Sequence, residues 1–147
     1  MTPDSEKVKV SCLECGATNN YPLGTNKAVV CGRCKAPLPV PGTVLELPQE
    51  QVVALIQNAT LPVLLDFSSP TCMPCHMMRP IVESLAKRRA GSLMVVKVET
   101  DQNPELAQAF KIKAVPTFIV LKKGFEVGRS SGALNETDFS LWVASKG

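Results

Sequence analysis

The chain has 147 residues, of which 45% are apolar and 20% charged, and this composition is typical of a packed globular protein. Its formal net charge of +3 comes from 16 basic and 13 acidic residues, so no segment is basic enough to require nucleic acid or an anionic membrane as a partner. The first residues lack the apolar core of a secretory signal, and no apolar run is long enough to span a bilayer. We therefore expect a soluble, cytoplasmic protein and a monomer.

All six cysteines occur in pairs with the spacing Cys-x-x-Cys. The pairs are Cys12/Cys15, Cys31/Cys34 and Cys72/Cys75. Six cysteines in a small secreted chain would indicate a disulfide framework, but pairs at this spacing favour metal and redox chemistry.

Composition divides the chain into three parts. Residues 1–36 hold the first two cysteine pairs and are poor in large apolar residues, so they could not bury enough surface to fold unaided. Residues 37–42 carry prolines at alternate positions, which predicts a stiff, extended connector. Residues 43–147 have the pattern of a compact α/β domain.

Apolar periodicity from residue 43 onward predicts alternating strands and helices. Strands are expected at 43–47, 61–67, 93–98, 117–121 and 125–130. Helices are expected at 48–58, 72–90 and 103–110, followed by a last helix with Asn135 as its N-cap. This order predicts a mixed sheet with helices on both faces.

The helix at 72–90 has two features of its own. Met73, Met77, Ile81 and Leu85 recur at intervals of four, which predicts a buried helix face that includes Met77. Pro80 lies inside the helix and is expected to kink it.

The four N-terminal cysteines have the spacing of a zinc ribbon. Fifteen residues separate Cys12-x-x-Cys15 from Cys31-x-x-Cys34, so that two tight turns can place four sulfurs at the corners of a tetrahedron. We expect structural Zn²⁺, which would supply folding energy that this segment lacks. Two disulfides or four free thiols are the alternative. Basic and aromatic residues are few here, which argues against a nucleic-acid role.

The third pair, Cys72-Met-Pro-Cys75, follows a predicted buried strand and opens a predicted helix. A helix N-terminus carries unpaired N–H groups and positive potential, which favour the thiolate of the first cysteine. Cys72 is therefore the expected nucleophile, and Cys75 is the expected resolving cysteine, which attacks the mixed disulfide. Pro74 lacks an N–H, which costs nothing in a first helical turn.

Residues 43–147 resemble the thioredoxin family along essentially their whole length. The matching runs are Leu64-Leu-Asp-Phe67, Cys72-Met-Pro-Cys75, Arg79-Pro80, Lys97 to Pro104, Ala114-Val-Pro-Thr-Phe118, Lys123-Gly124 and Gly132-Ala-Leu134. With the added four-cysteine segment, the chain is similar to the thioredoxin-2 type, which has an N-terminal zinc module. The resemblance implies a thioredoxin fold, exchange chemistry on protein disulfides and a thioredoxin reductase, or an equivalent electron donor, as partner.

The resemblance also implies roles for single residues. Asp66 matches the buried acid that exchanges protons with the second cysteine, and Lys97 matches the lysine near that acid. Pro116 matches a proline held in a cis peptide bond, and Val115 before it matches the residue whose backbone binds a substrate strand. Gly132 matches a glycine that lines the apolar docking groove.

Four positions near the third pair depart from the family pattern. Ser68 and Thr71 stand where the family usually has tryptophan, which should open the surface around the pair. Met73 replaces the usual glycine and, with Pro74, is expected to contact substrate as a flexible apolar side chain. His76 replaces a lysine and could favour the thiolate when it is protonated.

Two functions from different classes follow. The first is a cytoplasmic protein-disulfide reductase, in which Cys72 attacks a substrate disulfide, Cys75 releases the product and a reductase recycles the pair. The second is a redox-regulated zinc-binding interaction protein, in which oxidation of the N-terminal thiolates releases zinc and alters partner binding.

Overall fold

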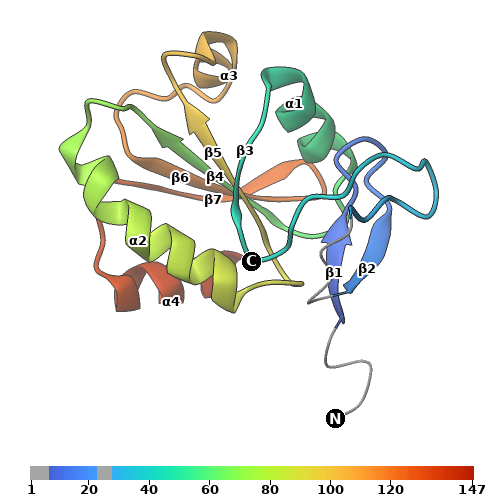
Figure 1. The fold of residues 1–147 in the computed structure, drawn as a ribbon. Helices are drawn as coiled ribbons and strands as arrows, with labels where there is room; N and C mark the ends of the chain where they lie inside the picture. The colour runs from blue at the N-terminus through green and yellow to red at the C-terminus, as the bar shows by residue number, and fades with distance from the viewer. Residues whose placement is uncertain (1–6, 23–27) are drawn as a thin grey trace.

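The computed structural model describes residues 7–22 and 28–147, and it contains an N-terminal hairpin followed by an α/β body (Figure 1). The strands are β1 (Lys7–Ser11), β2 (Thr18–Pro22), β3 (Val44–Glu46), β4 (Val63–Ser68), β5 (Met94–Glu99), β6 (Thr117–Lys122) and β7 (Phe125–Ser131). The helices are α1 (Gln49–Asn58), α2 (Met73–Arg88), α3 (Pro104–Ala109) and α4 (Glu136–Lys146). Every element predicted from residue 43 onward is present, in the predicted order.

The α/β body is built on a mixed sheet with the strand order β3-β5-β4-β6-β7. Strands β3, β5 and β4 run parallel, whereas β6 is antiparallel to β4 and β7 is antiparallel to β6. Because β4 is central and has helices on both faces, all six of its residues are buried. The predicted α/β fold class is confirmed.

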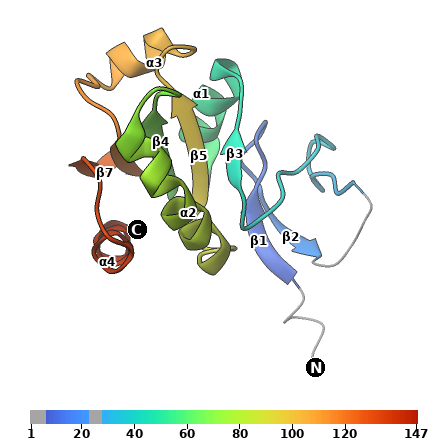
Figure 2. The same cartoon turned by 60° about the vertical axis from the view of Figure 1, so that its left-hand side comes forward.

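Helices cover both faces of the sheet (Figures 1 and 2). Helices α1 and α3 lie on one face, where Val52, Leu55 and Leu106 pack against alternate residues of β4 to β6. Helices α2 and α4 lie on the other face, where Phe139 packs against Phe118 with ring centroids 4.8 Å apart. Successive side chains of β4 point to opposite faces of the sheet. Leu65 and Phe67 therefore face α1, and Leu64 faces α2.

The prediction that Met77 belongs to the buried face of α2 was wrong. The helix buries Met78, Val82, Leu85 and Ala86 against the sheet, whereas Met73 and Met77 are 70% and 64% exposed. The spacing of apolar residues in this helix is compatible with burial of either of two neighbouring rows of side chains, one with Met77 and one with Met78. The sheet contacts Val82 and Leu85, so the row that contains Met78 is buried and Met77 points outward.

The N-terminal hairpin packs on the α/β body and shares its core. Val10, Leu13 and Tyr21 belong to the same buried cluster as Val52 and Leu55 of α1. The prediction that residues 1–36 form a module of their own concerns in part residues 1–6 and 23–27, which lie outside the described residues. Within the described part, the hairpin obtains from α1 the apolar contacts that its own sequence lacks.

Polar contacts fix the hairpin at the C-terminal end of α1. The buried hydroxyl of Ser11 accepts the backbone N–H groups of Thr60 and Leu61, each at 3.3 Å. Gly16 has a φ of +76°, and a Cβ at this position would overlap the backbone carbonyl of Asn58. Only glycine therefore permits this approach.

The connector predicted at 37–42 is partly absorbed into the cysteine-rich segment. Pro37 forms a β-bridge with Val30, and the N–H of Leu38 donates to the Val29 carbonyl at 2.9 Å. The chain then turns at Gly42, which has a φ of +77°. The extended part of the connector is therefore shorter than its prolines indicate.

Asn135 caps α4 as predicted, because its side-chain oxygen accepts the Asp138 N–H at 2.8 Å. Among the described residues, no helix is long and apolar enough to cross a membrane.

Candidate functional site

The third cysteine pair lies where β4 leads into α2. Cys72 is the N-cap of α2 and is disulfide-bonded to Cys75, with Cα atoms 5.2 Å apart. The backbone N–H of Cys75 points at the Cys72 sulfur at 3.2 Å. A thiolate at Cys72 would therefore accept a helix N-terminal N–H and lie at the positive end of the helix dipole.

The loop before β6 (Thr117–Lys122) lies against this pair at the same end of the sheet, because β6 is antiparallel to β4 and Thr117 pairs with Phe67. The Val115–Pro116 peptide bond is cis, and the Val115 carbonyl oxygen lies 3.7 Å from the Cys72 sulfur. The N–H of Gly132 donates to the Pro116 carbonyl at 2.9 Å, which brings the end of β7 to the same place. Gly132 has a φ of +93° and open space where a side chain would be. Cys72, Val115, Pro116 and Gly132 thus lie close together, and Pro116 is the buried member of the group.

Asp66 lies behind the pair and is 8% exposed. Burial raises the pKa of Asp66 to about 6, and the charge of Lys97 opposes this rise. The strand register explains why Lys97 lies near Asp66. Asp66 of β4 pairs with Lys97 of β5, and Lys97 pairs with Glu46 of β3 on its other side. A carboxyl with a pKa near neutrality can both accept and return a proton at physiological pH.

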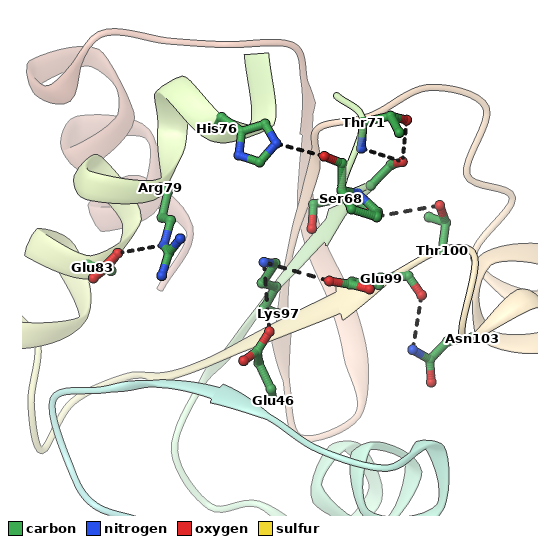
Figure 3. Close-up of polar contacts among 12 residues, drawn as sticks. Glu46, Ser68, Thr71, His76, Arg79, Glu83, Lys97, Glu99, Thr100 and Asn103 are labelled. Carbon is green, nitrogen blue, oxygen red and sulfur yellow. Dashed lines mark hydrogen bonds and ion pairs between the residues drawn. The ribbon is translucent and has the colours of Figure 1, made fainter. Parts of the chain in front are cut away.

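Sequence reasoning found Lys97 but missed the two acids that hold it. The Lys97 ammonium lies 3.7 Å from a carboxylate oxygen of Glu46 and 3.9 Å from one of Glu99 (Figure 3). Glu99 lies two residues after Lys97 on the same strand and therefore on the same face, and this spacing was a usable signal. Pairing of Glu46 with Lys97 depends on strand order, which the sequence does not reveal.

A cavity of about 570 Å³ opens between α2 and the sheet, directly behind Cys75. Asp66, Ser68 and Lys97 line it from the sheet, and His76 and Arg79 line it from α2. Figure 3 shows Ser68, His76, Lys97 and Glu46 around this opening. The Asp66 carboxyl is therefore largely buried and borders a space that also reaches Cys75.

The side chains that depart from the family pattern occupy different positions. Met73 follows Cys72 and its side chain is exposed. The ring of His76 donates from Nε2 to the Pro70 carbonyl at 2.7 Å, so it buttresses the loop before the pair. Thr71 is exposed and bonds to Ser69, with hydroxyl oxygens 3.2 Å apart, whereas Ser68 is buried.

The other four cysteines form a second site. Their sulfur atoms all lie within 4.8 Å of one another, and none is in a disulfide. Two of these distances join the two turns: the sulfurs of Cys12 and Cys34 are 3.5 Å apart, and those of Cys15 and Cys31 are 3.7 Å apart. Four thiolates around one ion at about 2.3 Å would be about 3.8 Å apart, so this donor set fits a tetrahedral metal.

Hydrogen bonds to sulfur support the same conclusion. The N–H of Glu14 points at the Cys12 sulfur at 3.4 Å, and the N–H of Arg33 points at the Cys31 sulfur at 3.3 Å. The side-chain amide of Asn19 lies 3.5 Å from the Cys31 sulfur. Such donors stabilise thiolates, which are the form that binds metal. These four residues can therefore bind a metal ion.

Comparison with known proteins agrees with this geometry. The thioredoxin family model matches residues 43–145. The chain belongs to the thioredoxin family. Among its relatives, thioredoxin C-3 of Corynebacterium nephridii is 35% identical over 91% of this chain and 92% of its own length. The thioredoxin of Haemophilus influenzae is 32% identical over 68% of this chain and 94% of its own length.

Family membership confirms the predicted enzyme class, because thioredoxins are protein-disulfide oxidoreductases, and the disulfide between Cys72 and Cys75 agrees with that chemistry. The match to thioredoxin C-3 covers 137 residues, more than residues 43–147 can supply. It therefore extends into the four-cysteine segment, as expected of the thioredoxin-2 type.

Proposed function

We propose that this thioredoxin reduces protein disulfides, with Cys72 as nucleophile and Cys75 as resolving cysteine. The Cys72 thiolate attacks one sulfur of a substrate disulfide, and the other substrate sulfur leaves as a thiolate. Cys75 then attacks the Cys72 sulfur of the mixed disulfide, which releases the second substrate thiolate and forms the Cys72–Cys75 disulfide. The observation that supports this order is that Cys72, not Cys75, caps α2 and faces the Val115 carbonyl.

We propose Asp66 as the group that removes the Cys75 proton before the second attack. Its carboxyl borders the cavity behind Cys75, and burial raises its pKa to about 6. Lys97 opposes that rise and keeps the acid able to ionise at neutral pH. The proton passes from the Cys75 thiol to the Asp66 carboxylate and returns to solvent after the product has left.

Substrate is proposed to bind on the surface around Cys72. The Val115 backbone would bond to an extended substrate segment, and Pro116 and Gly132 would form the floor beneath it. Met73 supplies an exposed, adaptable apolar contact, and Pro74 restricts the backbone between the cysteines. This surface involves mainly backbone and apolar groups, which suits protein substrates of varied sequence.

We propose Zn²⁺ as the metal of the four-cysteine site, held by Cys12, Cys15, Cys31 and Cys34. When bound, it would supply no redox chemistry and would hold the hairpin together. Reduced thiols at this site require a reducing compartment, which supports a cytoplasmic location. We also propose that the protein acts as a monomer and binds neither nucleic acid nor membranes.

The proposed electron donor is a thioredoxin reductase or an equivalent enzyme. One relative, from Mycobacterium leprae, is named a bifunctional thioredoxin reductase/thioredoxin, and this chain matches 20% of its length at 35% identity. In that protein the two activities are joined in one chain. A separate reductase is the corresponding partner proposed here.

Turnover of insulin disulfides with dithiothreitol as electron source tests the proposed function. Wild-type protein should accelerate the reduction, and Cys72→Ser should lose the acceleration. Cys75→Ser should instead accumulate a mixed disulfide, which mass spectrometry would detect. Equal activity of the Cys72→Ser variant and the wild type would refute the assignment.

A second function, redox-regulated zinc binding, is favoured by one observation. Cys34 is exposed, although its three partners are buried or half-buried, so an oxidant can reach one metal ligand first. Release of zinc under mild peroxide, together with altered partner binding, would support this function. A site that keeps its zinc while Cys72 and Cys75 oxidise would exclude it.

A further inference from the structure

Ser68 is the last residue of β4 and has an unusual environment. It is 3% exposed, and within residues 7–22 and 28–147 its hydroxyl oxygen is the buried side-chain polar atom that lacks a hydrogen-bond partner. Its backbone carbonyl is satisfied, because it accepts the Thr100 N–H at 3.0 Å. A buried hydroxyl without a partner loses its hydrogen bonds to water and gains none in return, so its retention calls for an explanation.

The direction of the Ser68 side chain follows from the strand. Residues two apart on β4 point to the same face, so Ser68 points the same way as Asp66, toward α2. Leu64 precedes them on this face and packs in the α2 cluster. Ser68, Asp66 and Cys75 line the same cavity. The hydroxyl therefore lies on the side of the disulfide from which the resolving thiol must be deprotonated.

The oxidised state gives the hydroxyl little to bind, since a disulfide sulfur is a weak acceptor. Opening the disulfide changes both chemistry and position. The two sulfurs are released from a bond of about 2.05 Å and must separate to van der Waals distance. The Cys75 sulfur then becomes a thiol or a thiolate, and a thiolate is a strong, charged acceptor.

We propose that Ser68 is a positioning residue for the resolving step, and that its hydroxyl donates a hydrogen bond to the Cys75 sulfur once the disulfide has been opened. This inference rests on the proposed role of Cys75 as the resolving thiol. Ser68 keeps its proton throughout, while Asp66 receives the proton of Cys75. The serine stabilises the thiolate and directs it at the Cys72 sulfur of the mixed disulfide.

Other charged groups face the same space and bear on its pH dependence. From the sheet these are Glu46 of β3, Lys97 and Glu99 of β5, and Asp66 of β4. From α2 these are His76, Arg79, Glu83 and Lys87. All of these groups remain in a Ser68→Ala variant. A change in the pH dependence of the resolving step in that variant is therefore due to the loss of the hydroxyl.

The test separates the two steps of one turnover. Reduced, zinc-loaded protein is mixed with a bis(nitrobenzoate) disulfide, which releases one coloured thiolate when Cys72 attacks and a second when Cys75 resolves. Ser68→Ala should leave the first phase unchanged and slow the second roughly tenfold near neutral pH. The pH profile of the second phase should also move to higher pH, because the thiolate has lost a donor.

Ser69→Ala is the matched control, because this neighbouring hydroxyl also borders the cavity but is bonded to Thr71. A second phase with the same rate and pH profile in Ser68→Ala and Ser69→Ala would overturn the inference. Asp66→Asn keeps that result distinct from failure of the proposed function. If Asp66→Asn slows the second phase and Ser68→Ala does not, only the role of Ser68 fails; if neither slows it, the proposed acid–base role of Asp66 fails as well.

Discussion

The two sulfur sites share the motif Cys-x-x-Cys and the same first turn. In all three pairs, the N–H after the second cysteine donates to the carbonyl of the first, at 3.0 Å for Gly16 and Lys35 and 3.2 Å for His76. The chains then diverge. Gly16 and Lys35 adopt left-handed φ values of +76° and +67°, whereas His76 continues a helix of 16 residues.

This difference in backbone decides the chemistry. A left-handed residue closes each N-terminal turn, and Cys12 and Cys31 both donate their N–H back to an alanine carbonyl five residues later. The closed turns leave four sulfurs facing one point, which suits a metal. The third pair instead lies at the N-terminus of a helix, near the buried Asp66 and beside the Val115–Pro116 loop. Cys-x-x-Cys spacing alone therefore does not distinguish the metal-type pairs from the third pair. In this chain the backbone conformation of the residue after the motif distinguishes them, because it is left-handed at Gly16 and Lys35 and helical at His76.

The largest predicted contrast comes from removing one cysteine at each site. Cys72→Ser should lower insulin reduction by more than about a thousandfold while zinc remains bound, because no other group supplies the nucleophile. Cys31→Ser should lose zinc and keep measurable reductase activity at temperatures where the protein stays folded. Metal analysis and turnover assays on both variants check this. Loss of activity in Cys31→Ser with zinc retained would break the comparison.

A second contrast concerns the attachment of the hairpin. Gly16→Ala places a methyl group against the Asn58 carbonyl at a left-handed φ, so the free energy of unfolding should fall by about 3 kcal/mol. Gly32→Ala is the control, because its Cβ would meet only the Asn19 side chain at 3.7 Å, an ordinary contact. Denaturant titration of the zinc-loaded variants measures both. Equal losses would show that the close packing at Gly16 does not exist in solution.

A third prediction concerns the buried acid. Burial raises the pKa of Asp66 from 3.8 to about 6, so the folded state holds this proton more tightly than the unfolded state does. The contribution of Asp66 to stability is therefore lost as pH rises from about 4 to about 6. Above that range, Asp66→Asn should stabilise the oxidised protein by about 2–3 kcal/mol, and below about pH 4 the gain should disappear.

Denaturant titrations of the oxidised protein at pH 4 and pH 8 would check this prediction. Asp101→Asn serves as the control, because Asp101 is exposed and its substitution should leave the free energy of unfolding nearly unchanged. A gain for Asp66→Asn that is the same at both pH values would contradict the raised pKa.

The smallest predicted effect is on substrate affinity. Met73 is 70% exposed beside Cys72, so Met73→Ser should raise the KM for a protein disulfide a few-fold through lost apolar contact and leave kcat and stability nearly unchanged. Leu141→Ser is matched in exposure at 65% but lies on α4. Steady-state kinetics should show a higher KM for Met73→Ser than for Leu141→Ser. An equal KM for the two variants would show that substrate does not contact Met73.

Much of the α/β body could be predicted because each element carries a local signal. Strand β4 is a continuous apolar run, and Asn135 caps α4 with a side chain suited to that task. Asp66 stood out because an acid in a buried strand requires a role. The thiol pair stood out because its spacing coincides with a helix start. Each of these signals is contained within a few neighbouring residues of the chain.

The remainder depends on contacts between distant segments. Whether Met77 or Met78 is buried depends on how α2 rotates against the sheet. Sequence analysis did not predict the hairpin strands β1 and β2, because Val10 and Tyr21 are buried in a cluster shared with distant elements such as α1. The unpartnered hydroxyl of Ser68 and the cavity beside it likewise arise from strand pairing and from the position of α2.

The most direct test of the two-site account is an equilibrium redox titration of zinc-loaded protein against dithiothreitol or glutathione. Differential alkylation and mass spectrometry would report each cysteine. We predict one two-electron transition, confined to Cys72 and Cys75 and near about −270 mV, the thioredoxin reference. The other four thiols should stay reduced and metal-bound throughout. Oxidation of those four in the same transition, or a potential near about −120 mV for Cys72 and Cys75, would contradict the account.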